Sequence, residues 1–245
     1  MNAALAAAAT LVALAFCLST LDRWLRRRRP HELAWTVSLA LFALGSLALW
    51  WAESAGWSLG AFRIFYMAGA VLNVPWLAPG TVYLLAGQRV GDRVKWWLVF
   101  LSGLTVGIVG FAPTDAPVSG DVMPTGKEVF GIAPRVLAAV GSGVAAVVII
   151  AGALWSAWRV WRGRNPSLGG QRTITAPGRL VWGNLLIATG TLVLSGSGTL
   201  AGRLGKDRAF AVTLLVGIVV LFLGFLVASA PPRRKAAAPE LRSVA

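Results

Sequence analysis

The stretch WAESAGWSLGAFRIFYMAGAVLNVPWLAPGTVYLL, from Trp51 to Leu85, joins the end of one apolar run to most of the next. The whole chain of 245 residues is 57% hydrophobic and only 13% charged. A soluble core of this size would need a larger polar surface to cover it, so the composition is typical of an integral membrane protein. The stretch also carries Asn73, Pro75 and Pro79, which a simple lipid anchor does not need.

Seven apolar segments are long enough to cross roughly 30 Å of hydrocarbon as helices. Because these runs are long and do not alternate apolar with polar residues, we interpret them as helices and not as barrel strands. We therefore predict an all-α, seven-helix membrane domain over residues 1–230, followed by a disordered basic cytoplasmic tail over residues 231–245. The predicted helices are Ala3–Leu21, Leu33–Ala52, Ile64–Leu85, Trp96–Ala112, Val136–Trp155, Leu180–Leu200 and Ala209–Ala230.

The basic residues predict an orientation for this bundle. Alternate loops and the tail hold 17 of the 23 lysines and arginines, beginning with the cluster at residues 26–29. The positive-inside bias therefore places the N-terminus outside and the C-terminus in the cytoplasm, which requires an odd number of spans. The first apolar run has no basic residue before it, unlike a secretory signal, so we expect it to remain as an uncleaved helix. No soluble basic face is left to bind nucleic acid, and we expect no such partner.

The third predicted helix carries a stripe of polar, aromatic and small side chains at spacings of three and four residues. Residues so spaced share one face of a helix. A lipid-facing stripe would leave the amide of Asn73 without a partner, so we expect the stripe to face the bundle interior. There it is a candidate lining for a ligand-binding pocket. The stripe consists of Tyr66, Gly69, Asn73, Trp76, Gly80 and Tyr83.

Two prolines at the edge of this stripe predict a kink. Pro75 and Pro79 have no N–H, so the carbonyls of Val71 and Pro75 lose their helical donors. We expect a neighbouring side chain or water to bind the freed carbonyls. Proline kinks and glycine contacts are also common where membrane helices pack closely. Close packing and a ligand cavity therefore remain alternative interpretations of the stripe.

Charged residues lie near the predicted outer interface. Glu53 and Arg63 flank a short loop, which favours a surface ion pair worth at most about 1 kcal/mol. The alternative is that the two residues form the rim of a pocket that opens to the outside. The other residues of this predicted outer rim are Glu128, Arg135, Arg203 and Asp207.

The residues of the chain argue against catalysis. It has one cysteine, Cys17, and one histidine, His31, which excludes an internal disulfide framework, paired-histidine haem ligation and histidine-rich metal sites. The predicted spans hold no acidic pair, no Cys/His couple and no lysine that could form a Schiff base. We therefore expect no enzyme activity, no metal site and no cofactor.

The region from Leu39 to Arg93 has a familiar order of features. An apolar span closes in a tryptophan and acidic pair, followed by FRIFYMAG, the proline-broken LNVPWLAPGTVYLLAG and a basic turn. This order of features resembles that of the N-terminal seven-helix sensor domain of bacterial histidine kinases and diguanylate cyclases. The resemblance implies sensing of a small ligand, with output through the seventh helix. The sequence departs from that family after Ala230, where 15 residues follow in place of a kinase or cyclase domain.

Two kinds of function remain open at this point. The first is a stand-alone bacterial sensor or ligand-binding protein of the plasma membrane, which binds a small molecule in an outward-facing pocket. Its partners would be the lipid bilayer and a separate signalling protein or membrane complex. The alternative is a small carrier, or an accessory or scaffolding subunit of a membrane complex.

Overall fold

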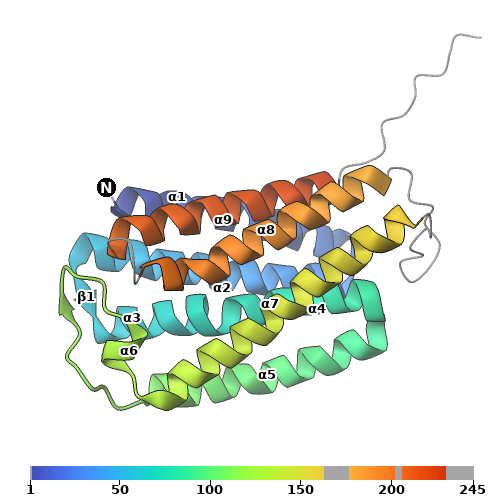
Figure 1. The fold of residues 1–245 in the computed structure, drawn as a ribbon. Coiled ribbons are helices and arrows are strands. Elements are labelled where there is room, and N and C mark those ends of the chain that lie inside the picture. Colours follow the sequence, from blue (N-terminus) through green and yellow to red (C-terminus); the bar gives the residue numbers. More distant parts are fainter. Residues whose placement is uncertain (1, 163–176, 202–205, 230–245) are drawn as a thin grey trace, which may run out of the picture.

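The computed structural model describes residues 2–162, 177–201 and 206–229, and nearly all of them are helical. The long helices run roughly alongside one another (Figure 1), which confirms the predicted all-α class. The elements are α1 (Asn2–Arg27), α2 (Pro30–Ala55), β1 (Trp57–Ser58), α3 (Leu59–Phe65), the π-helix η1 (Tyr66–Leu72), α4 (Asn73–Ala86), α5 (Gln88–Gly110), β2 (Ser119–Gly120), α6 (Gly126–Val129), α7 (Ile132–Trp161), α8 (Pro177–Ala201) and α9 (Lys206–Ser229).

Six helices in the described part of the chain are long and apolar enough to cross a membrane, which supports a multi-pass membrane protein. One of them is continuous through α3, η1 and α4, from Leu59 to Ala86. Helix α8 is not among the six, because the longest run described with its side chains, Leu185–Gly196, is apolar but shorter than a membrane span. The predicted tail at residues 231–245 lies outside the described residues, as do residues 163–176 between the fifth and sixth predicted helices.

Local sequence signals explain where several helices begin and end. Helix α2 has Pro30 in its first turn, where the missing N–H costs nothing, and it ends at Gly56 with φ of 89°. The hydroxyl oxygen of Ser58 accepts a hydrogen bond from the backbone N–H of Ala61 at 3.3 Å and so caps α3. Gly87, with φ of 84°, makes the tight reversal between α4 and α5. These turns set consecutive helices antiparallel.

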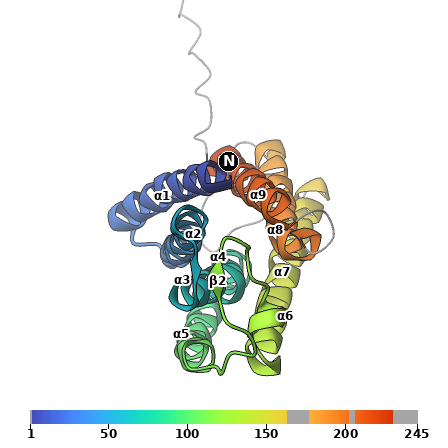
Figure 2. The same ribbon diagram turned by 90° about the vertical axis from the view of Figure 1, so that its left-hand side faces the viewer.

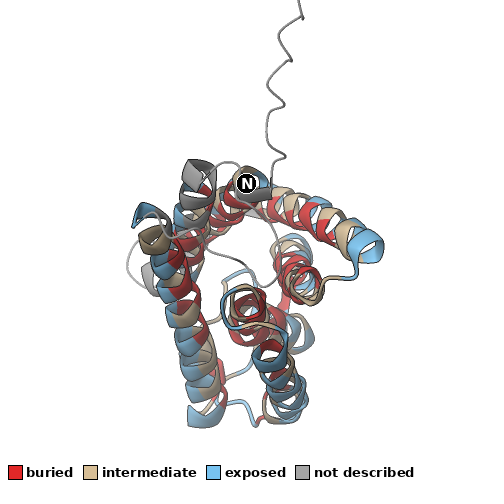
Figure 3. Cartoon of the chain, turned by 90° about the vertical axis from the view of Figure 1, so that its right-hand side faces the viewer, coloured by how far each residue is buried: buried red, intermediate tan, exposed pale blue. Residues whose placement is uncertain are grey.

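Six helical units form a closed ring, and α5 lies outside it. Around the ring, α1 packs on α2, α2 on α4, α4 on α7, α7 on α8, α8 on α9 and α9 back on α1 (Figure 2). Helix α5 packs mainly on α4, on the outer side of the ring. Buried residues lie on the sides of the helices that face one another, as Figure 3 shows. The ring brings the first and last helices of the chain together.

One end of the ring is closed by short elements and aromatic side chains. Strands β1 and β2 pair antiparallel, with Trp57 opposite Gly120. Beneath this pair, the rings of Phe62 and Phe130 stack with centroids 5.4 Å apart, and Tyr66 meets Phe130 edge-on at 5.1 Å. Phe65 extends the contact to Phe210 on α9, at 5.8 Å. We call the five rings of Phe62, Phe65, Tyr66, Phe130 and Phe210 the aromatic cluster.

Candidate functional site

The π-helix η1 is the irregular point of the third span. A π turn holds one residue more than an α turn, so it rotates the residues after it by about 100° relative to those before it. Pro75 has no N–H, which removes the donor that a continued π register would supply to the carbonyl of Ala70. The hydroxyl of Ser142 on α7 donates to this carbonyl at 2.6 Å. A neighbouring side chain therefore binds a backbone carbonyl in this region. The carbonyl is that of Ala70, whereas the predicted one was that of Val71.

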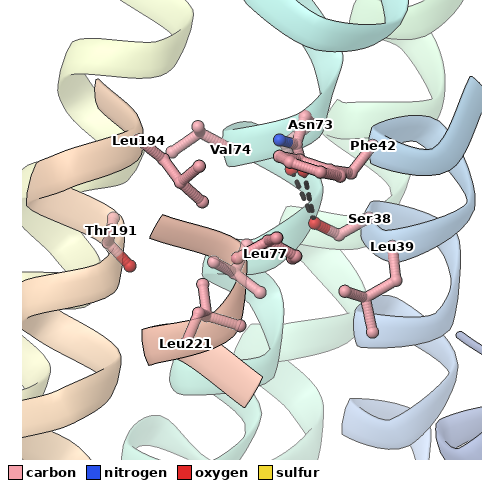
Figure 4. Close-up of a pocket in the computed structure, with 10 residues that line it drawn as sticks. Ser38, Leu39, Phe42, Asn73, Val74, Leu77, Thr191, Leu194 and Leu221 are labelled. Atoms are coloured by element: carbon pink, nitrogen blue, oxygen red, sulfur yellow. Dashed lines mark hydrogen bonds between the residues drawn. The ribbon is translucent and has the colours of Figure 1, made fainter. Parts of the chain in front are cut away.

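A buried polar contact joins the end of η1 to α2. The hydroxyl of Ser38 donates to the backbone carbonyl of Asn73 at 2.8 Å and lies 3.0 Å from its side-chain oxygen Oδ1. Ser38 is 1% exposed and Asn73 is 7% exposed. Among the described residues, no hydrogen bond uses the amide nitrogen of Asn73, which lies on the side away from Ser38 (Figure 4). The fully buried side-chain atoms without a hydrogen-bond partner lie elsewhere in the described residues, at Glu32, Trp57 and Arg63.

Asn73 lines a small cavity at the centre of the ring (Figure 4). The cavity measures about 10 Å³, roughly the room that one water molecule needs. Its wall is apolar apart from three residues. The hydroxyl of one of these, Thr191, donates a hydrogen bond to the carbonyl of Ile187 at 2.8 Å. The lining residues are Ser38, Leu39 and Phe42 of α2, Asn73, Val74 and Leu77 of α4, Thr191 and Leu194 of α8, and Ile218 and Leu221 of α9.

The cavity is therefore a meeting point of four helices that the chain visits far apart in sequence. One donor, the amide of Asn73, and one acceptor, the hydroxyl oxygen of Thr191, are available within an apolar wall. Such a site can hold a water molecule, or a small apolar molecule with a hydrogen-bond acceptor if the ring opens. It offers no nucleophile with a neighbouring base. Within the described part of the chain, no three His, Cys, Asp or Glu residues come close enough to hold a metal ion.

Of the six stripe residues, only Asn73 is part of this lining. Gly69 lies against Gly45 of α2, where a Cβ on Gly45 would be 3.1 Å from the Gly69 backbone. Gly80 lies directly against the indole of Trp35, also on α2. These close approaches are what small residues permit between membrane helices. In the structure, both glycines therefore pack against α2.

The aromatic members of the stripe contact other parts of the molecule. The indole N–H of Trp76 donates to the hydroxyl of Ser102 on α5 at 3.0 Å. The hydroxyl of Tyr83 donates to the carboxylate of Asp92 at 2.8 Å, close to the α4–α5 turn. Tyr66, which precedes the rotation in η1, belongs to the aromatic cluster. The residues of the stripe thus contact three different neighbours, which are α2, α5 and the aromatic cluster.

The stripe lies between helices, with Tyr66, Asn73, Gly80 and Tyr83 buried and Gly69 and Trp76 half-buried, but most of it is not at the cavity. Its later members point between α2 and α5, whereas the cavity-lining side of α4, with Val74 and Leu77, is about a quarter turn further around the helix. The physical reason is that neighbouring helices satisfy the polar side chains and receive the small ones. The side of α4 that faces the cavity is mostly apolar, so polar residues alone could not identify it.

The two prolines occupy different positions in α4. Pro75 is the third residue of α4, close to its junction with η1. Pro79 lies inside the helix. The irregularity that the structure shows is the π-helix just before Pro75, and a kink at the two prolines stays a prediction.

The predicted outer rim does not gather around this cavity. The guanidinium of Arg63 donates to the carbonyl of Ala112 at 2.7 Å, just beyond the C-terminus of α5. The carboxylate of Glu128 accepts from the backbone N–H of Thr125 at 3.1 Å and caps α6. Glu53 lies in the last turn of α2, and the exposed Arg135 lies in the first turns of α7. Arg203 and the side chain of Asp207 lie outside the described residues.

Sequence reasoning missed most of the cavity lining, including Ser38, Thr191 and the α9 residues. Ser38 is a lone hydroxyl on an apolar helix, and this is a weak signal because serines in membrane helices commonly bond their own backbone. Thr191 carries the same ambiguity. Leu194, Ile218 and Leu221 do not differ in type from the lipid-facing leucines and isoleucines of the chain.

Comparison of the chain with protein-family models, with curated proteins and with solved structures found no significant match in any of the three. What the protein does must therefore be argued from the ring, the cavity and the surface.

Proposed function

We propose that this chain forms a seven-helix unit in a bacterial plasma membrane that binds a small ligand at the centre of its ring and acts through a separate partner protein. The observation that carries the proposal is the cavity itself. Asn73 presents an unused donor there, next to a π-helix, and π-helical turns occur frequently at functional sites. An acceptor atom of a ligand could take a hydrogen bond from this amide.

The chemistry of the cavity restricts the ligand class. The apolar wall favours a compact apolar molecule, and the Asn73 amide favours one with a carbonyl, ether or similar acceptor oxygen. In the described state the cavity holds no more than a water molecule, and the aromatic cluster lies between the cavity and the β1–β2 end. Binding therefore requires α8 and α9 to move away from α2 and α4. The end of α9 would carry that movement to the partner.

The ligand proposal is tested by mass spectrometry of the small molecules that co-purify with the protein in mild detergent. Asn73→Leu removes the donor, and Ser142→Ala is the matched control, because it removes an interhelical hydrogen bond on the other side of the same π-helix. We expect either change to lower the free energy of unfolding by up to about 1–2 kcal/mol. Only Asn73→Leu should lose the ligand. A wild-type protein that carries nothing except lipid would contradict the proposal and leave Asn73 as a purely structural contact.

The span count and orientation complete the proposal, with α8 as the seventh span and the N-terminus outside. In support, the ends of α1 and α7 and the α4–α5 turn lie at one end of the ring (Figure 1), and each carries arginine or lysine. The positive-inside bias assigns that end to the cytoplasm. A topology reporter fused at Gly120 should report the exterior, and one at Arg28 the cytoplasm. A cytoplasmic signal at Gly120 would reverse the orientation.

An accessory subunit of a larger membrane complex is the second candidate, and α5 is the observation that favours it. This helix lies outside the ring, with Trp97 71%, Phe100 63% and Phe111 85% exposed. A photo-crosslinking residue at position 100 distinguishes the two functions. Capture of one protein in stoichiometric amount favours the subunit, whereas capture of lipid alone contradicts it.

A further inference from the structure

Tryptophans collect at the end of the ring that carries the α4–α5 turn. Seven of the 12 tryptophans lie there, in the last turns of α1 and α7 and the early turns of α5 and α8. Five of these seven are more than half exposed, and Trp161 reaches 84%. Indole rings prefer the boundary between hydrocarbon and headgroups. The seven, which we call the tryptophan belt, are Trp24, Trp96, Trp97, Trp155, Trp158, Trp161 and Trp182.

Cations stack on the tryptophan belt on three different helices. The guanidinium carbon of Arg28 lies 4.9 Å from the ring centre of Trp24, and that of Arg162 lies 4.2 Å from Trp158. The ammonium of Lys95 lies 5.6 Å from Trp96. A guanidinium stacked on an indole keeps its N–H groups at the edge free to donate, and planar guanidinium forks match phosphate oxygens.

The two ends of the molecule differ in charge among the side chains that the structure describes. The tryptophan-belt end holds three carboxylates and ten cations, whereas the opposite end holds four carboxylates and three cations. Only two of the three carboxylates, Asp22 and Asp92, lie within ion-pair distance of a described cation. The ten cations are Arg23, Arg26, Arg27, Arg28, Arg29, Arg89, Arg93, Lys95, Arg159 and Arg162.

From these observations we propose that the tryptophan-belt end binds anionic phospholipid headgroups. The phosphates lie against the arginines and the lysine, and the acyl chains lie along the helices below. The helices continue from this belt into exposed apolar side chains, such as Phe100 and Val99 on α5 and Leu154 on α7. A nucleic acid or an acidic protein would satisfy the charges and leave these apolar faces uncovered. An anionic lipid covers both.

This inference rests on the membrane insertion included in the proposed function and is independent of the central ligand and of the orientation. Each cation near an anionic membrane surface contributes roughly five-fold in affinity. The attraction weakens within a Debye length, so it should fall as salt is raised. Loss of lipid preference with an intact central ligand, or the reverse, separates the two proposals.

The test reconstitutes the full chain in nanodiscs made from equal amounts of phosphatidylglycerol and phosphatidylcholine, and measures the lipids that remain bound on gentle extraction. We expect wild type to retain phosphatidylglycerol several-fold over phosphatidylcholine. The double variant Arg93→Gln/Arg162→Gln should lower that preference several-fold. It leaves the arginines at residues 26–29 intact, so insertion of the first two helices is not disturbed. The control Lys127→Gln/Arg135→Gln removes two cations from the opposite end and should retain the wild-type preference.

Two further measurements keep the test decisive. Thermal unfolding of each variant verifies that it is folded before its lipids are counted. Inorganic phosphate, added at an ionic strength matched with sodium chloride, should displace no more phosphatidylglycerol than the chloride does, because the proposed ligand is the lipid and not free phosphate. Equal preference in wild type and the double variant, no preference in wild type, or displacement by phosphate alone would each overturn the proposal.

Discussion

The α8–α9 pair makes two very different contacts within the ring. Between the two helices, glycines bring the backbones together, and a Cβ on Gly190 would lie 2.7 Å from the amide nitrogen of Leu221. Across the ring, the same pair meets α2 and α4 around a cavity of about 10 Å³. The first contact has no room for a methyl group, and the second has room for a water molecule.

The two contacts indicate where the molecule can change shape. Backbones in close contact gain dispersion energy that is lost if they separate, whereas atoms beside a void have few partners to lose. We therefore expect α8 and α9 to move as one body, with the change taken up across the ring. Substitutions that add volume should be costly between α8 and α9 and tolerated at the cavity.

The largest effect is expected for Gly190→Val. Its side chain would meet the backbone of α9 at Leu221, which cannot move without separating the two helices. We expect the free energy of unfolding to fall by about 2–3 kcal/mol, as in overpacked cores. Unfolding in mixed micelles with increasing SDS measures this loss.

Gly196→Val is the control for that change, because it lies on the same helix and a Cβ there meets nothing within 4 Å. It carries the same loss of backbone freedom and the same change of helix propensity. Equal losses for the two variants would show that α8 and α9 are not tightly packed.

A smaller effect is expected at the cavity for Val74→Ile. The added methylene enters the void, so the free energy of unfolding should change by less than about 1 kcal/mol. Val71→Ile adds the same group one turn earlier, at a residue that is 0% exposed and is not among the cavity-lining residues. There we expect a loss of about 1–3 kcal/mol. If Val74→Ile is as costly as Val71→Ile in the same SDS titration, the cavity does not accept a larger group.

Part of the candidate site could be predicted from the sequence. Asn73 was identified because an amide deep in an apolar helix needs a partner, and the structure gives it one in Ser38. Val74 and Leu77 could not be identified, because an apolar side chain fits a cavity wall, a helix contact and lipid equally well. Gly69 and Gly80 were placed on the correct helix, but their partners on α2 depend on how two distant segments pack.

The amino-acid sequence is enough to specify that the chain is helical and apolar enough for a membrane. In lipid, a backbone must satisfy its own hydrogen bonds, and runs of about 20 apolar residues do so only as helices. It also determined which segments become helices, since these follow from local composition.

The way in which those helices face one another follows from the tertiary structure. It closed six helical units into a ring with α5 outside, directed Arg63 to Ala112, and brought Thr191 and Ile218 to the same cavity as Asn73. The reason is that, between helices already surrounded by lipid, hydrophobicity no longer selects a partner. Shape, small residues and single hydrogen bonds between distant segments make that choice.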